Sequence, residues 1–199
     1  MTLRIETVTG EQIIPWLNEL AELRIRVFRD FPYLYDGSLD YEMDYLATYT
    51  RCARSICVLA LDGNRVVGAS TGLPLAEEVA EFRAPFAAAG LNETRIFYCA
   101  ESVLLPEYRG RGLYRRFFEG REQHARTLGF DTAVFCAVVR PEHHPLKPAN
   151  YRPLTDIWAR FGYYPEPGLL TRFCWKDRDQ SEETAKPMQF YLKPLETSQ

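Results

Sequence analysis

Residues 101–116, which read ESVLLPEYRGRGLYRR, decide the fold. An apolar segment ends at Pro106, a basic turn with two glycines follows, and a pattern typical of an amphipathic helix begins at Gly112. Glycine lets backbone N–H groups approach a ligand closely, and a helix start adds unpaired donors and about half a positive charge. The stretch therefore favours a polyphosphate ligand. The alternative is an ordinary strand-to-helix turn with a solvated basic face.

The rest of the chain alternates between strand and helix patterns around this stretch. Apolar runs predict strands over 3–8, 55–61, 65–73, 95–105, 131–139, 169–175 and 188–195. Helical spacing predicts helices over 15–28, 77–89 with a break at Pro85, 112–128 and 154–161. Residues 30–45 are predicted to form an irregular segment that leads into a helix ending at residue 51. The order predicts an α/β (α+β) fold: a mixed, mostly antiparallel sheet with helices on both faces, in one domain over residues 1–199.

Composition excludes several classes of protein. The 199 residues are 46% hydrophobic and 26% charged, which is a globular mixture, and the net charge of −3 argues against nucleic-acid binding. No apolar run is long enough to span a membrane, and no secretory signal is visible at the start of the chain. The five cysteines include no CxxC pair, so we expect buried thiols, no metal, no membrane partner and a cytoplasmic location.

The glycine turn resembles the acetyl-CoA motif of the GNAT superfamily of N-acetyltransferases. It contains neither GxxxxGK[ST] nor GxGxxG, but it matches the family pattern [RQ]xxGx[GA] at Arg109 and Gly112, with Tyr114 in place of the final small residue. The tyrosine places a bulky side chain near the expected pyrophosphate. Residues 157–166, IWARFGYYPE, are similar to the family's YxxxGF corner, and residues 186–195, KPMQFYLKPL, to its last strand.

The resemblance implies a splayed central pair of strands that holds acetyl-CoA as co-substrate. The pantetheine arm would lie in the gap and bond to backbone groups of the first of these strands. The residues expected to contact acetyl-CoA are Val103, Leu104, Leu105, Arg109, Gly110, Arg111, Gly112, Leu113, Tyr114 and Arg115.

Acetyl transfer to an amine needs a base, a stabilised oxyanion and a departing thiolate. Glu101 is the candidate base, because it is the only acid between Arg95 and Pro106; the alternative is a carboxylate paired with an arginine. The Leu104 N–H is placed to polarise the thioester carbonyl. Where the family carries its donor tyrosine, this chain has Trp158, so we rank Tyr151 first as the proton donor.

Residues 30–45 form an acidic, aromatic segment with five acids, four tyrosines and no basic residue. The resemblance places this segment over the acceptor cleft, so we expect Tyr33, Tyr35 and Asp36, together with His143 of a later loop, to bind a cationic amine. The alternative is a solvated acidic helix whose tyrosines pack on the sheet.

The sequence thus predicts an acetyl-CoA-dependent N-acetyltransferase that acts on a primary amine of a small molecule or peptide by direct attack in a ternary complex. The alternative is a non-catalytic acyl-CoA-binding or regulatory module with the same fold, since Trp158 and Tyr114 depart from the family pattern. A third reading has a longer acyl donor, with Tyr114 reshaping the site. We expect a monomer or a homodimer.

Overall fold

The computed structural model describes residues 3–196. The helices and strands in that range are β1 (Leu3–Val8), α1 (Leu17–Phe28), α2 (Leu39–Arg51), β2 (Ile56–Asp62), β3 (Arg65–Pro74), α3 (Ala80–Ala88), β4 (Ile96–Tyr98), β5 (Ser102–Leu104), α4 (Leu113–Thr127), β6 (Thr132–Val138), α5 (Thr155–Arg160), β7 (Tyr164–Lys176) and β8 (Glu183–Pro194).

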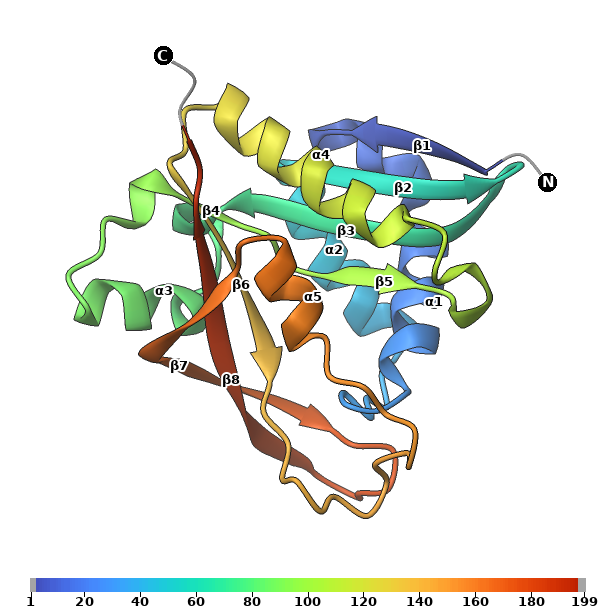
Figure 1. The fold of residues 1–199 in the computed structure, drawn as a ribbon. Coiled ribbons are helices and arrows are strands. Elements are labelled where there is room, and N and C mark those ends of the chain that lie inside the picture. Colours follow the sequence, from blue (N-terminus) through green and yellow to red (C-terminus); the bar gives the residue numbers. More distant parts are fainter. Residues whose placement is uncertain (1–2, 197–199) are drawn as a thin grey trace.

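The described strands form one sheet in the order β1-β2-β3-β4-β6-β8-β7, and β5 pairs with β3 beside this path. Pairing is antiparallel everywhere except between β4 and β6, which run parallel. Helices α4 and α5 cover one face, while α1 and α2 cover the other (Figure 1). This arrangement confirms the predicted mixed, mostly antiparallel sheet with helices on both faces.

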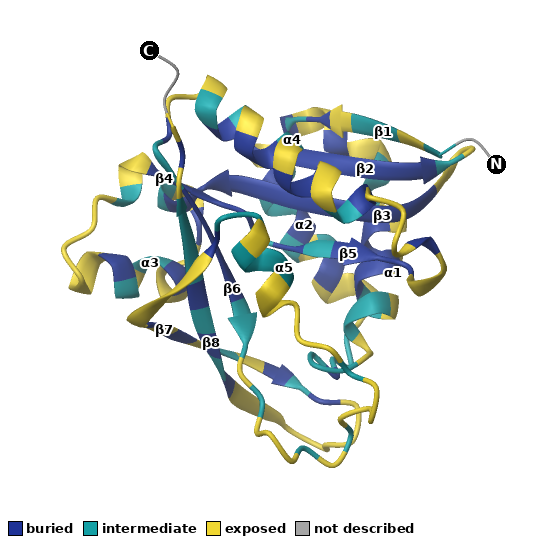
Figure 2. Ribbon diagram, viewed as in Figure 1, coloured by how far each residue is buried: buried dark blue, intermediate teal, exposed yellow. Residues whose placement is uncertain are grey.

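The core lies along β2 and β3, which are buried over nearly their whole length (Figure 2). Helix α4 approaches β2 closely at Gly120, where an added Cβ would stand 2.8 Å from a methyl carbon of Val58. A side chain at position 120 would therefore push the helix away from the sheet. By contrast, the loop after β6 and the turn between β7 and β8 are largely exposed (Figure 2).

The segment 95–105, expected to be one strand, is two strands with different partners. The Cys99 N–H donates to the carbonyl of Val134 on β6, whereas the next N–H, that of Ala100, donates to the carbonyl of Thr71 on β3. The chain therefore changes neighbour at this point, and an apolar run cannot reveal such a change because both halves are buried.

Helix α3 runs through Pro85 without the expected break. Proline lacks the N–H that would bond the carbonyl four residues earlier, at Glu81. The Thr171 hydroxyl of β7 donates to that carbonyl at 2.6 Å, so a neighbouring strand supplies the missing bond. Helix α2 also begins earlier than expected, at Leu39, because the Ser38 side chain caps it.

None of the helices in residues 3–196 is long and apolar enough to cross a membrane.

Candidate active site

The sheet opens between β5 and β6. Strands β4 and β6 pair as far as Tyr98 and Val134, and beyond that point β5 pairs with β3. On its other side β6 pairs with β8 along its whole length. The edge of β5 that faces β6 is therefore left open, which confirms the splayed central pair implied by the family resemblance.

Two of the three backbone positions expected to face this gap face β3 instead. The Leu105 N–H donates to the Val67 carbonyl at 3.0 Å, and the Leu105 carbonyl accepts from the Tyr108 N–H at 3.0 Å. Residues of an antiparallel pair alternate in direction, so Val103 bonds to β3 as Leu105 does. For these two residues, the expectation that their backbone groups are free for a ligand is wrong.

Leu104 and Ser102 turn their backbone groups toward the gap by the same alternation. The carbonyl of Leu104 lies 3.4 Å from the donating Nε of Arg109, so the glycine turn and the gap are directly connected. Ser102 was not among the residues predicted from the sequence. Its spacing of two residues from Leu104 along one strand is the pattern that places the two on the same edge.

The glycine turn leaves open space at the start of α4. Gly110 and Gly112 have φ angles of +76° and +78°, and a Cβ added to either would meet no atom within 4 Å. The first helical bond here runs from the Arg116 N–H to the Gly112 carbonyl at 3.3 Å. The N–H groups of residues 113–115 therefore have no helical acceptor and remain free for an anion.

Three arginines add positive charge around this turn. Arg109 and Arg111 are exposed, and Arg111 donates to the Glu107 carbonyl at 3.1 Å. The guanidinium of Arg115 lies 5.3 Å from the centre of the Phe161 ring. Within residues 3–196 none of the three forms an ion pair with a carboxylate, so their charge is available to a phosphate.

Tyr114 does not fill the space above the glycine turn. No atom of it lies within 4 Å of a Cβ added to Gly112. Its ring packs against Phe118, with 5.2 Å between ring centres, and its hydroxyl accepts a hydrogen bond from the Trp158 indole N–H at 2.9 Å. The two residues that depart from the family pattern are thus in direct contact, and the space around Gly112 stays open.

These features fit acetyl-CoA. The turn offers N–H groups and arginines to a pyrophosphate, and β5 offers an open strand edge to an amide-containing arm. Within residues 3–196 no group of three or more His, Cys, Asp or Glu side chains is placed to hold a metal ion.

Glu101 lies in a buried charge cluster on the opposite face of the sheet from α4. Its Oε1 atom is 2.7 Å from Nη1 of Arg24, and the Tyr45 hydroxyl is 3.5 Å from its Oε2 atom. Arg24 also donates from Nε to Glu42, which is fully buried. One guanidinium therefore joins two carboxylates and fixes Glu101 in place at the break between β4 and β5.

A third buried carboxylate, Glu78, lies in the same region and was not among the residues predicted from the sequence. It follows β3 and accepts a hydrogen bond from the Val79 N–H at 3.1 Å. Burial raises the pKa of Glu78 to about 7, and the negative charge of Glu101 adds to this rise. Its position after a strand carries no recognisable sequence signal.

The loop between α1 and α2 is fastened to the far end of the sheet by Arg140. The Arg140 guanidinium donates to the carbonyls of Pro32 and Tyr33 at 2.7 and 2.6 Å, and to the carboxylate of Asp177 at 2.7 and 2.9 Å. Trp175 also donates to the Tyr33 carbonyl, at 3.0 Å. No sequence pattern predicts this anchor, because its parts lie in three segments that are far apart along the chain.

Three of the four predicted acceptor-binding residues, Tyr33, Tyr35 and Asp36, lie in this loop, and two basic side chains balance the charge of Asp36. Asp36 forms ion pairs with Lys176 at 2.6 Å and with Arg29 at 3.2 Å, and these partners hold its pKa below the ordinary value. Burial raises the pKa of the Tyr33 and Tyr35 hydroxyls well above the usual range, so both phenols are neutral.

Tyr151 and His143 lie in the loop after β6. Tyr151 is half-buried and meets Phe31 edge-on, with 4.6 Å between ring centres, so it packs against the α1–α2 loop. His143 is exposed. Trp158, rather than Tyr151, is the side chain that the structure joins to Tyr114 at the start of α4.

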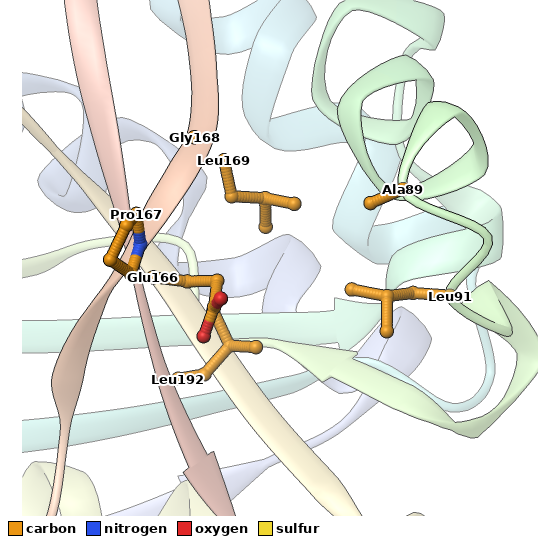
Figure 3. Close-up of a pocket in the computed structure, with 7 residues that line it drawn as sticks. All are labelled: Ala89, Leu91, Glu166, Pro167, Gly168, Leu169 and Leu192. Carbon is orange, nitrogen blue, oxygen red and sulfur yellow. The ribbon is translucent and has the colours of Figure 1, made fainter.

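A hollow of about 460 Å³ lies elsewhere, between the end of α3 and a bulge in β7 (Figure 3). Leu91 and Leu169 point into it from opposite sides (Figure 3). None of the predicted site residues lines this hollow.

Comparisons with known proteins agree with the open gap and the glycine turn. The family model of the acetyltransferase (GNAT) family matches residues 17–147. The chain therefore belongs to the GNAT family of acetyltransferases. No curated protein sequence matches the chain.

Solved structures show the same fold. An N-acetyltransferase from Staphylococcus aureus Mu50 is 13% identical, with a TM-score of 0.61 over 98% of this chain and 100% of that one. An aminoglycoside 6'-acetyltransferase type Ii is 14% identical, with a TM-score of 0.57 over 98% and 99%. The ribosomal-protein-S18-alanine N-acetyltransferase from Escherichia coli is 10% identical, with a TM-score of 0.58 over 100% and 97%. At these identities the similarity concerns the fold alone.

Proposed function

We propose that this protein transfers an acetyl group from acetyl-CoA to a primary amine of a small molecule or peptide, by direct attack in a ternary complex. The observation that carries the proposal is the pairing of an open glycine turn with an open β5 edge, joined by Arg109. Together they offer sites for both the pyrophosphate and the amide-containing arm of one molecule.

The acceptor side supports an amine. Glu101 is held by Arg24 at the end of the gap opposite the glycine turn, where it would take the proton of an incoming ammonium group. Leu104 turns its N–H into the gap, in position to polarise a thioester carbonyl. Two structural neighbours are named for amine-bearing acceptors, an aminoglycoside and the alanine of a ribosomal protein.

Calorimetry with acetyl-CoA tests the binding half of the proposal. Gly112→Asp places a carboxylate in the open space beside the helix start, so we expect acetyl-CoA affinity to fall at least tenfold, about 1.4 kcal/mol. Gly90→Asp is the matched control, because Gly90 also has a positive φ of +70° and open space around it, but lies after α3. Equal affinity in the two folded variants would contradict the site.

A screen of amines, followed by release of free thiol, tests the transfer half. The panel contains cationic and neutral primary amines and a peptide with a free amino terminus. We expect acetyl-CoA to be consumed with at least one cationic amine. Tight binding of acetyl-CoA without turnover across the panel would favour a non-catalytic module instead.

A further inference from the structure

Tyr114 and Trp158 form a polar contact at the front of the gap that the proposed function leaves without a role. Trp158 lies on α5 and packs against the ring of Phe135 on β6, with 5.0 Å between ring centres. Figure 1 shows α5 in front of the region between β5 and β6. Tyr114 reaches the same place from the first turn of α4, through the 2.9 Å hydrogen bond from the Trp158 indole.

The direction of this bond matters. An indole N–H can only donate, so the Tyr114 oxygen is the acceptor and keeps its own proton. Among residues 3–196 no group accepts a hydrogen bond from the Tyr114 hydroxyl. The phenol therefore holds an unused proton, half-buried at the gap, and its oxygen is fixed by a partner that cannot take that proton away.

The pKa of the Tyr114 phenol is raised above its ordinary value, so the phenol carries its proton at neutral pH. Burial raises the pKa of the phenol, whereas the Trp158 N–H and the positive charge of Arg121 lower it. Arg121 lies on the same helix and is fully buried. No carboxylate is among these neighbours, so no negative charge beside the phenol opposes the phenolate that proton loss would leave.

We propose that Tyr114 is the acid that protonates the departing sulfur, and that Trp158 is its positioning residue. The inference rests on the proposed acetyl transfer. As nitrogen bonds to the acetyl carbon, the carbon–sulfur bond breaks and its electron pair leaves on sulfur. Before the attack, the ammonium group gives one proton to Glu101, which releases it to solvent. Tyr114 gives its proton to the departing sulfur, and the nitrogen loses a second proton, which passes through Glu101 and solvent to the phenolate. The net products are the amide, the free thiol and one proton released to solvent.

The first test removes and restores the acid. Tyr114→Phe is expected to lower kcat about 100-fold, the lower end of general acid catalysis, with unchanged Kd for acetyl-CoA. Adding Trp158→Tyr to this variant places a phenol on α5 beside position 114 and is expected to recover at least tenfold of kcat. Trp158→Tyr alone is the control. A higher kcat or tighter acetyl-CoA binding in Tyr114→Phe would overturn the proposal, because it would mean that the Tyr114 hydroxyl hinders acetyl-CoA binding or acetyl transfer.

The second test measures the pH dependence of kcat and the pKa of the Tyr114 phenol. The pKa of the phenol would not affect kcat in this way if Tyr114 served only to pack the two helices together. Tyr114→3-fluorotyrosine keeps the shape and lowers the pKa of the phenol, so the alkaline fall of kcat is expected to shift to lower pH. Fluorine NMR of the protein without acetyl-CoA follows the same phenol, and Trp158→Phe is expected to raise its pKa. An unmoved pH profile would overturn the assignment. If the wild type consumes no acetyl-CoA with any amine, the proposed function fails. If the wild type consumes acetyl-CoA and the Tyr114 variants have the same kcat, only the role of Tyr114 as the acid fails.

Discussion

Among single residues, the site depends on buried charges whose partners lie far apart in the sequence. Arg24 of α1 lies between Glu42 of α2 and Glu101 at the strand break. Removing the guanidinium would leave two uncompensated carboxylates, at a typical cost of about 3–5 kcal/mol. The acidic segment of residues 30–45 therefore serves partly as structure, since Glu42 faces the core rather than a substrate.

The role of Glu101 as the base is separable from its role in this cluster. Glu101→Gln is expected to lower kcat about 100-fold with unchanged acetyl-CoA affinity, because the amide cannot take a proton. Glu42→Gln is the matched control, since it breaks the other contact of Arg24 and leaves Glu101 intact. Steady-state kinetics with the best amine measure both. Equal losses in the two variants would mean that the ion pairs, not proton transfer, account for the effect.

Glu78 makes stability depend on pH. Its pKa rises from 4.5 to about 7 on folding, so the folded protein binds the proton more tightly than the unfolded chain does. Stability is therefore lost as pH rises from about 4.5 to about 7, and the difference between pH 5 and pH 8 amounts to about 2 to 3 kcal/mol.

Urea unfolding of Glu78→Gln at these two pH values checks this expectation. The amide does not titrate, so the variant should gain about 2 to 3 kcal/mol relative to the wild type on going from pH 5 to pH 8. Glu81→Gln, an exposed acid of the next helix, is the control and should follow the wild type. If the difference in unfolding free energy between Glu78→Gln and the wild type were the same at pH 5 and pH 8, the pKa of the Glu78 carboxyl would not be raised in the folded protein.

For the helices and strands, the hydrophobic periodicity of the sequence predicted where each element lies but not which neighbour each strand pairs with. The strand 95–105 was expected as one piece, and the change of partner at Cys99 and Ala100 depends on hydrogen bonds to two different neighbours. Arg121 of α4 stabilises this break by donating to the carbonyls of Thr71 and Glu101 at 3.3 and 2.9 Å. A basic residue on the buried side of a helix gave no hint of that role.

The glycine turn was predictable because its requirements are local. Positive φ angles at Gly110 and Gly112, and the helix start that follows, are set by neighbouring residues. The contact between Tyr114 and Trp158, on which the proposed proton donor rests, was not predictable, because it joins two helices that are far apart in the sequence. Tyr151, which the sequence ranked first for that role, packs against Phe31.

Across the whole molecule, the gap divides the sheet into two parts. Strands β1, β2, β3 and β5 lie on one side, and β4, β6, β8 and β7 lie on the other, joined by the short pairing of β3 with β4. An extended ligand bound along β5 would lie like an added strand between the two parts. Such a ligand would stabilise the whole fold by about 2.7 kcal/mol at one hundred times its Kd.

Amide hydrogen exchange separates that general stabilisation from binding along β5. Stabilising the whole fold slows exchange at every protected amide, including those of Val103 and Leu105, whose backbone groups already bond to β3. The amides of Ser102 and Leu104 face the open gap, so without ligand they should exchange faster than these neighbours. Saturating acetyl-CoA should slow the exchange of the Ser102 or the Leu104 amide by about tenfold more than it slows exchange at Val103 and Leu105. This difference corresponds to about 1.4 kcal/mol of local protection.

The measurement is residue-resolved NMR exchange with and without acetyl-CoA, and the amides of Val103 and Leu105 in the same segment serve as the internal control. Equal slowing at all four would mean that acetyl-CoA stabilises the fold without lying along β5, and the open edge would then need another occupant.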